Sequence, residues 1–257
     1  AEQAFQEARI LYSLSPEANF RLVQEVLLRQ SRFTECRQLM QEFAAADPGN
    51  GRVPQFLSHL DNLKSLNDQI LELEKKRRTG NLDAASALRL AELYRSAQQT
   101  GRFMQIVNSL LATSNLPPQF VYQAATMLHK AKKYKEMGKA LEQMKSLSLP
   151  NSPPELFLNM ARMYADAKDM VKMAGSLQEY LKRKPEDWKA WLDLGYVYIV
   201  AKQENAARQA VTHARQIGGA EAEAILLKDA RFKSLRLSAQ PQATPLRALP
   251  GILPQGN

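Results

Sequence analysis

The sequence has a single cysteine, Cys36, so no disulfide bond can form within the chain. It has no apolar run long enough to cross a bilayer as a helix, and no basic segment followed by an apolar run is visible at its start. Stretches of Val, Ile and Thr that alternate with polar residues are scarce, which disfavours a β-sheet protein. Ala, Leu, Gln, Glu, Lys and Met are plentiful instead, and this usage favours helix throughout.

Motifs for catalysis and metal binding are also missing from the sequence. The three histidines, His59, His129 and His213, lie far apart, and there is no His-Glu-x-x-His or Cys-x-x-Cys pattern. No Gly-x-Gly-x-x-Gly motif or P-loop offers a place for phosphate. Cys36 occupies a small-residue position with no base predicted nearby, so we interpret it as a core thiol. We expect no metal, no cofactor and no enzymatic activity.

The charge of the chain is basic, with a formal net charge of +9 over 257 residues. Two clusters contribute to it, at residues 75–78 and from Lys130 to Lys145. Such charge suits an acidic partner or an anionic membrane, but lysines interrupted by glutamates usually form a solvated helix face. Few aromatic residues are interleaved and no nucleic-acid motif is present, so we expect no nucleic acid as a partner.

An internal repeat organises the chain, and it is clearest between Pro185 and Ala214. Spacings of three and four residues put large apolar residues and one glycine on one stripe of a helix. A second helix follows with small and apolar residues, where two helices could cross closely. The stripe consists of Trp191, Leu194, Gly195 and Tyr198, and the second helix contributes Ala207, Val211 and Ala214.

The same arrangement recurs 34 residues earlier, which makes chance agreement improbable. Phe157, Met160, Ala161 and Tyr164 hold the equivalent first-helix positions, followed by Leu177 and Tyr180. These residues resemble the signature of the tetratricopeptide repeat family. The resemblance implies an all-α, right-handed α-solenoid of helix-turn-helix repeats.

Looser copies of the pattern extend the array toward the N-terminus, and proline and glycine mark its boundaries. We predict a repeat domain over residues 1–237. Its parts are a half-repeat at 1–16, repeats at about 17–50, 84–117, 118–153, 154–187 and 188–221, one long atypical helix at 54–78 and a capping helix at 222–237.

Two segments depart from the repeat. In residues 54–78, six apolar residues from Leu57 to Leu73 follow one stripe, which either packs on adjacent repeats as a lengthened helix or pairs with a second chain as a coiled coil. A dimer through this helix is therefore one possibility. Residues 238–257 contain four prolines and two glycines and no acidic residue, so we expect a proline-rich flexible tail.

The family resemblance also implies a binding surface. First helices of tetratricopeptide repeats line a concave groove that receives an extended peptide or a partner helix. Arginine and tyrosine are common anchors of interfaces because each offers a large area and directed hydrogen bonds. Carried onto this sequence, the groove positions give the candidate partner-binding residues Arg21, Arg29, Arg95, Tyr122, Lys130, Arg162, Lys189 and Tyr196.

The sequence leaves two functions open. The first is a non-catalytic scaffold that binds a peptide or partner protein in the groove. The second rests on short strings such as residues 15–21, 47–50, 90–94 and 185–192, which resemble soluble helical-repeat tails of bacterial multi-pass membrane proteins classed as glycosyltransferases. That resemblance implies an accessory domain whose partner is the rest of its own polypeptide. A half-repeat at the start agrees with such a tail.

Overall fold

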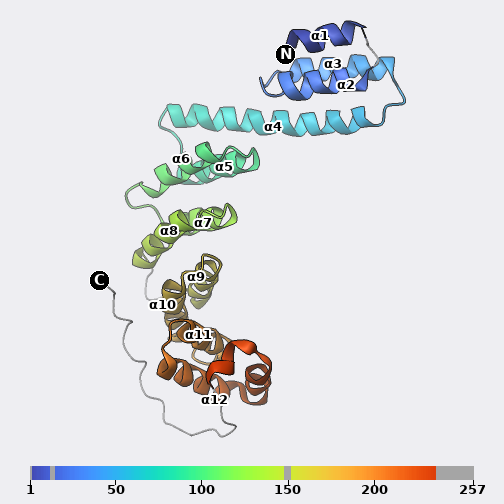
Figure 1. Ribbon diagram of the computed structural model, residues 1–257. Coiled ribbons are helices and arrows are strands. Elements are labelled where there is room, and N and C mark those ends of the chain that lie inside the picture. Colours follow the sequence, from blue (N-terminus) through green and yellow to red (C-terminus); the bar gives the residue numbers. More distant parts are fainter. Residues whose placement is uncertain (1, 12–14, 148–151, 236–257) are drawn as a thin grey trace. The chain divides into compact units, whose positions relative to one another are not determined.

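The structure is a computed structural model that describes residues 2–11, 15–147 and 152–235 (Figure 1). Every regular element in these ranges is helical, as predicted from composition and periodicity. The chain divides into two compact units, residues 1–127 and residues 128–257, and each is described by itself. The predicted tail at 238–257 lies outside the described residues.

Unit 1 begins with helices α1 (Glu2–Leu11), α2 (Pro16–Arg21), the π-helical turns η1 (Leu22–Leu27) and α3 (Phe33–Ala46). Ser15 caps α2 by accepting the backbone N–H of Ala18 at 3.4 Å. The core of this part is aromatic and apolar, with the Phe20 ring set edge-on to Phe43 and Phe56 at 6.1 and 5.6 Å. Cys36 is fully buried here, which confirms a core thiol.

The long helix of unit 1 is α4 (Arg52–Arg78), two residues longer at its start than the predicted 54–78. Its N-terminal half packs on α3 and its C-terminal half on α5 (Ala84–Ser96), as Figure 1 shows. Leu60, Ile70 and Leu73 of the leucine stripe are buried by these neighbours. Leu57, Leu63 and Leu66 stay half-buried, so the dimer through this helix remains a prediction that rests on part of the stripe.

The remaining helices of unit 1 are α6 (Thr100–Leu111) and most of α7 (Pro118–Lys130). Asp83 caps α5 by accepting the N–H of Ser86 at 2.8 Å. The small and apolar residues predicted on the first helix, among them Ala87 and Leu90, are buried against α6, where Phe103 and Ile106 are buried in turn. The segment therefore folds as one helical hairpin.

Unit 2 contains the end of α7 and then α8 (Tyr134–Leu147), α9 (Pro154–Asp166), α10 (Met170–Leu181), α11 (Trp188–Val200) and α12 (Glu204–Lys228). Helices α9 and α10 form one hairpin, and α11 and α12 the next (Figure 1). Gly195 lies where α11 crosses α12, and a Cβ atom added there would lie 3.0 Å from Val211. The glycine at this position therefore lets α11 and α12 approach closely, as the sequence pattern predicted.

Adjacent hairpins are joined by a recurring tyrosine of the first helix. Tyr94 donates its hydroxyl to Glu74 of α4 at 2.6 Å, and Tyr164 donates to Glu142 of α8 at 3.0 Å. Tyr198 accepts from the side-chain amide of Gln178 at 2.7 Å. In each case a buried ring carries a polar end to the second helix of the preceding hairpin.

The turn between the two helices of each hairpin has one repeated geometry. A residue with a positive φ follows the first helix, its N–H bonds to the carbonyl three residues earlier, and the next N–H bonds to the carbonyl five residues before it. This is a Schellman motif, which glycine usually completes. The chain instead uses Ser31, Gln98, Lys132, Lys168 and Lys202.

The cap predicted at 222–237 consists, within the described residues, of a final helical segment and a short 3-10 helix. Helix α12 passes through Gly218 and changes direction at Gly219, whose φ of 52° is left-handed, and then continues to Lys228. A 3-10 helix, η2 (Ala230–Leu235), follows and buries Phe232 and Leu235. The backbone of Gly219 is not helical, so the glycine pair interrupts the helix, and the cap is the last part of α12 together with η2.

Candidate functional site

The three arginines predicted as groove residues in unit 1 each bind a carboxylate of their own helix or turn. These contacts are pairs one turn apart, exposed for Arg21 and Arg29 and part-buried for Arg95, and exposed pairs of this kind contribute little to stability. The pairs are Arg21 with Glu17, Arg29 with Glu25 and Arg95 with Glu92, each at 2.5 Å. The structure does not gather them into one cluster.

The predicted residues of α7 are placed separately. Tyr122 is half-buried, and its backbone carbonyl accepts the Thr126 hydroxyl at 2.9 Å. Lys130, the last residue of the helix, is exposed and has no ion pair within the described residues. Beside it, His129 Nε2 lies 2.8 Å from the Asp166 carboxylate at the end of α9. This contact ties the ends of two successive first helices together in unit 2.

Side chains from three segments of unit 2 meet on α11. Tyr196 is half-buried, and the guanidinium of Arg231, from η2, lies 5.0 Å above its ring centroid. The same guanidinium lies 3.9 Å from Asp193 and bonds Asp229 at 2.7 Å through Nε. Arg162 of α9 is exposed and acts electrostatically on Asp193. Arg231 therefore links the predicted residue Tyr196 to Asp193, and the charge of the predicted residue Arg162 acts on the same carboxylate.

The two carboxylates near Arg231, Asp229 and Asp193, differ in how well they are hydrogen-bonded. Burial raises the pKa of Asp193 above its usual range, although Arg231 and Arg162 act in the opposite direction. The pKa of Asp229 is lowered, because the Arg231 side chain and backbone N–H both donate to it. Arg231 is thus committed to Asp229, and Asp193 is left as a partly desolvated carboxylate whose side chain is still 47% exposed. A donor from a ligand would stabilise it.

Lys189 extends the cluster along α11. It lies four residues before Asp193 and seven before Tyr196, so the three residues share one helical stripe. Its ammonium group lies 5.4 Å from the ring centroid of Trp188. The stripe of Lys189, Asp193 and Tyr196, together with Arg162 and Arg231, is called the α11 cluster below.

Sequence reasoning missed two members of the α11 cluster. Asp193 could have been predicted from the sequence, because its spacing of four residues from Lys189 and three from Tyr196 puts it on the same helix face. No sequence pattern predicts Arg231 as a member, since it reaches Tyr196 only after the chain turns back at Gly219. Its position depends on contacts between residues 35 apart in the sequence.

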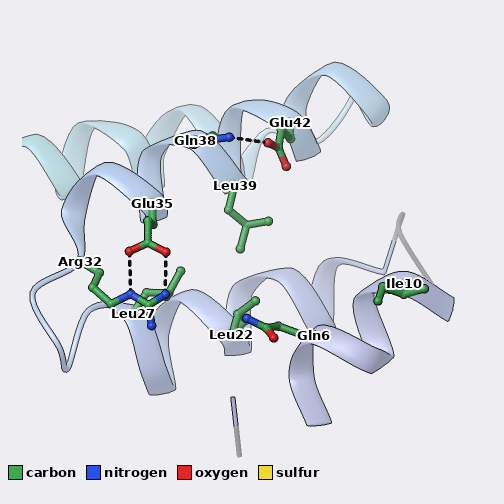
Figure 2. Close-up of a pocket in the computed structure, with 9 residues that line it drawn as sticks. All are labelled: Gln6, Ile10, Leu22, Leu27, Arg32, Glu35, Gln38, Leu39 and Glu42. Atoms are coloured by element: carbon green, nitrogen blue, oxygen red, sulfur yellow. Dashed lines mark hydrogen bonds and ion pairs between the residues drawn. The ribbon is translucent and has the colours of Figure 1, made fainter. Parts of the chain in front are cut away.

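Unit 1 has a separate cavity of about 360 Å³ between α1, η1 and α3. Its apolar walls come from Ile10, Leu22, Leu27 and Leu39, and Figure 2 shows Leu39 directed from α3 into the space between these elements. The rim is polar, with Gln6, Arg32, Glu35, Gln38 and Glu42. Apolar walls with a polar rim suit a ligand that has an apolar group next to a polar one.

Arg32 sets the shape of this cavity. Its guanidinium bonds both oxygens of Glu35 at 2.7 and 2.6 Å, which Figure 2 shows as two parallel contacts, and also bonds Glu2 of α1 at 2.7 Å. The pKa of Glu35 is lowered because Arg32 donates to its charged form. Arg32 therefore links α1 to the start of α3.

No group of three or more His, Cys, Asp or Glu side chains able to hold a metal ion occurs in the described part of the chain. None of the described helices combines the length and the apolar character that a membrane span requires.

Comparison with known proteins gives structural similarities only. No family model and no curated protein sequence matches the chain. The solved structure of the C-terminal part of a TPR repeat-containing protein from Cytophaga hutchinsonii is 12% identical, with a TM-score of 0.46 over 82% of this chain and 87% of that one. YrrB, described as a TPR protein with an unusual peptide-binding site, is 12% identical, with a TM-score of 0.42 over 89% of this chain and 100% of its own.

MamA from Desulfovibrio magneticus is 15% identical, with a TM-score of 0.39 over 84% of this chain and 99% of its own. With TM-scores below 0.5, these similarities do not bear on what this chain binds. The hairpins of the chain itself, with their buried Gly195 crossing and repeated tyrosine contacts, carry the assignment of fold. The chain is an all-α protein of successive helical hairpins that resemble tetratricopeptide repeats.

Proposed function

We propose that the chain is a non-catalytic scaffold that binds a peptide or a segment of a partner protein on the first-helix face of unit 2. The observation that carries this proposal is the α11 cluster. There an exposed arginine, a half-exposed carboxylate and a half-buried tyrosine ring lie together on neighbouring first helices.

The chemistry of the cluster suits a peptide. Arg162 can donate to a backbone carbonyl or a carboxylate of the ligand, and Asp193 can accept from a backbone or side-chain donor. The Tyr196 ring offers a flat apolar face that Arg231 covers from one side. Tyrosine and arginine side chains of this kind dominate the energetics of protein interfaces.

The surroundings of the reactive side chains support a non-catalytic role. The Cys36 thiol is buried, and desolvation raises its pKa to about 11, so it is not a thiolate near neutral pH. The His213 ring is stacked on Trp191 at 4.8 Å, and burial lowers its pKa. Both side chains serve packing between helices.

The test uses a peptide selected from a displayed random library on the full chain, with its affinity measured by fluorescence anisotropy. We expect Arg162→Glu combined with Tyr196→Ala to weaken that affinity by about thirtyfold or more, the effect of losing an interface anchor. The circular dichroism spectrum should be unchanged, since Arg162 is exposed and makes only a 3.5 Å bond to Asn159.

The matched control is Arg208→Glu. Arg208 is an exposed arginine of α12 that binds Glu204 at 2.7 Å and lies outside the α11 cluster. Its reversal should leave peptide affinity within about twofold, as expected of an exposed charge outside the binding site. A selected peptide whose affinity is the same for the double variant and the unmodified chain would contradict the proposal.

A further inference from the structure

Three lysines occupy one repeated position at the hairpin ends of unit 2. Lys132, Lys168 and Lys202 have φ values of 56°, 59° and 57° and complete the Schellman motifs that follow α7, α9 and α11. Glycine or asparagine adopts this conformation at lower cost than lysine. The position lies just beyond the last turn of a helix, and all three side chains are exposed.

The three turns follow one another along a single edge of unit 2. Tyr164 lies four residues before Lys168 and bonds Glu142, which lies ten residues after Lys132. In the same way, Tyr198 lies four residues before Lys202 and bonds Gln178, which lies ten residues after Lys168. Both junctions use residues at equivalent positions, so we infer that each hairpin is placed on the one before it in a similar way. The contact of His129 with Asp166 links the first two turns directly.

Most of the excess positive charge belongs to this unit. Residues 128–257 contain 21 Lys and Arg against 13 Asp and Glu, whereas residues 1–127 contain 14 against 13. Four further lysines flank the first turn. Together with the three turn lysines they form the surface named here the lysine edge: Lys130, Lys132, Lys133, Lys135, Lys139, Lys168 and Lys202.

The charges of the lysine edge are not neutralised from within. None of its seven lysines has an ion pair in the described part of the chain, whereas Lys172, Lys182 and Lys184 of the same unit do. Two of the nearby acids are engaged in side-chain pairs, Asp166 with His129 and Glu204 with Arg208. Asp169 caps α10 and lies 3.9 Å from Lys172, and Glu136 is half-buried.

Exposed apolar side chains accompany these lysines. Val171, three residues after Lys168, is 65% exposed, and Val200, two residues before Lys202, is 46% exposed. Val171 lies in the first turn of α10 and Val200 is the last residue of α11, so each is next to a turn that carries one of the lysines. The edge therefore presents long cationic side chains and short apolar ones together.

We propose that the lysine edge docks on the surface of a bilayer that contains anionic phospholipid. Lysine is a compact point charge that attracts phosphate without a fixed geometry, which suits a laterally mobile headgroup layer. The two valines are placed to enter the headgroup region beside it. A single-stranded nucleic acid is less suited, because the one aromatic of these turns, Tyr134, is half-buried and lies 6.3 Å from the His129 ring.

This surface is distinct from the α11 cluster, so the inference stands apart from the proposed peptide binding. The test measures co-sedimentation of the full chain with vesicles of 70% phosphatidylcholine and 30% phosphatidylserine, at 50 and 300 mM salt. We expect binding that weakens with salt and is absent from vesicles of pure phosphatidylcholine. Substituting K132Q, K168Q and K202Q together should lower the partition coefficient by roughly a hundredfold, at about fivefold for each lysine.

Glutamine is the appropriate replacement, since Gln98 occupies the same left-handed position in unit 1. The matched control removes three charges of unit 2 that are not part of the lysine edge, by K182Q, K184Q and K228Q, and should lower binding less than tenfold. No binding to the phosphatidylserine vesicles at 50 mM salt, or equal losses in the two triple variants, would overturn the proposal. So would tight binding of a 20-residue polyglutamate through the same lysines without vesicle binding, which would assign the edge to an acidic peptide.

Discussion

Replacing Tyr164 by phenylalanine tests how one helical hairpin is held to the next. The Tyr164 ring is buried, with 2% of its surface exposed, and its hydroxyl donates to Glu142 of the preceding hairpin at 3.0 Å. The substitution removes this bond and leaves the ring in place. It therefore separates the polar contact between hairpins from apolar packing.

The expected cost follows from the two partners. A hydrogen bond to a charged group contributes about 1.5–3 kcal/mol when both partners are buried. Glu142, however, is 47% exposed and lies 3.6 Å from Lys172, so water and the lysine still solvate it in the variant. We therefore expect Tyr164→Phe to lower the free energy of unfolding by about 1 kcal/mol, which is below that range.

Urea unfolding followed by circular dichroism measures this cost. Tyr134→Phe is the control, because Tyr134 is a half-buried tyrosine of the same unit, and it should change stability by less than about 0.5 kcal/mol, as an exposed hydroxyl does. A double-mutant cycle with Glu142→Ala, which removes the acceptor, should give a coupling free energy of most of that roughly 1 kcal/mol. Equal effects of the two tyrosine substitutions would refute the reasoning.

The pH dependence supplies a second test of the same contact. Burial and the neighbouring Glu142 charge raise the pKa of Tyr164 above its ordinary value of 10.0. The folded state therefore holds the phenolic proton more strongly than the unfolded state. Its contribution is fully present below about pH 10 and is lost as the pH rises further. In the Tyr164→Phe variant, the free energy of unfolding should therefore fall less steeply with pH between about pH 10 and 11 than it does in the unmodified chain.

Two further outcomes test the core. Gly195→Ala should destabilise the chain by about 1–2 kcal/mol, since the new Cβ would lie 3.0 Å from Val211 and 3.6 Å from the Ala207 carbonyl. Gly101→Ala, in α6 with no atom within 4 Å of the new Cβ, should stabilise it by about 0.5–1 kcal/mol, and thermal unfolding compares the two. Cys36 is fully buried and its pKa is raised to about 11, so at pH 8 a thiol reagent should label it much more slowly in the native chain than in urea. Equal labelling rates would show that the N-terminal helices open readily.

The leucine stripe of α4 shows a limit of sequence reasoning. A stripe of this kind reads alike whether it packs within the chain or against another chain. The fold resolves part of it, because α3 and α5 bury Leu60, Ile70 and Leu73 from opposite ends of the helix. Of the half-buried leucines, Leu57 packs against the core of the N-terminal helices, so Leu63 and Leu66 are the residues of the stripe left for a second chain.

The candidate groove residues stay a prediction, and the structure places them differently from one another. Tyr196 is linked to Asp193 through Arg231, and the charge of Arg162 acts on that carboxylate, whereas Arg21, Arg29 and Arg95 are held in local pairs. A helical stripe gives the face on which a residue lies, but not the partner that reaches it from elsewhere. Arg231 is such a partner, and it covers Tyr196 only because the chain turns back after Gly219.

The sequence by itself determined the helical hairpins and much of their core, since both follow from periodicity within a dozen residues. The stripe of Trp191, Leu194, Gly195 and Tyr198 is buried as its spacing predicts. It also contained an unread signal, the dipeptide Ala-Lys that ends at Lys132, Lys168 and Lys202. Only the tertiary structure showed that these lysines stand in left-handed turns along one edge, and that Arg231 meets Tyr196. Such placements depend on how successive hairpins pack, and local periodicity does not encode them.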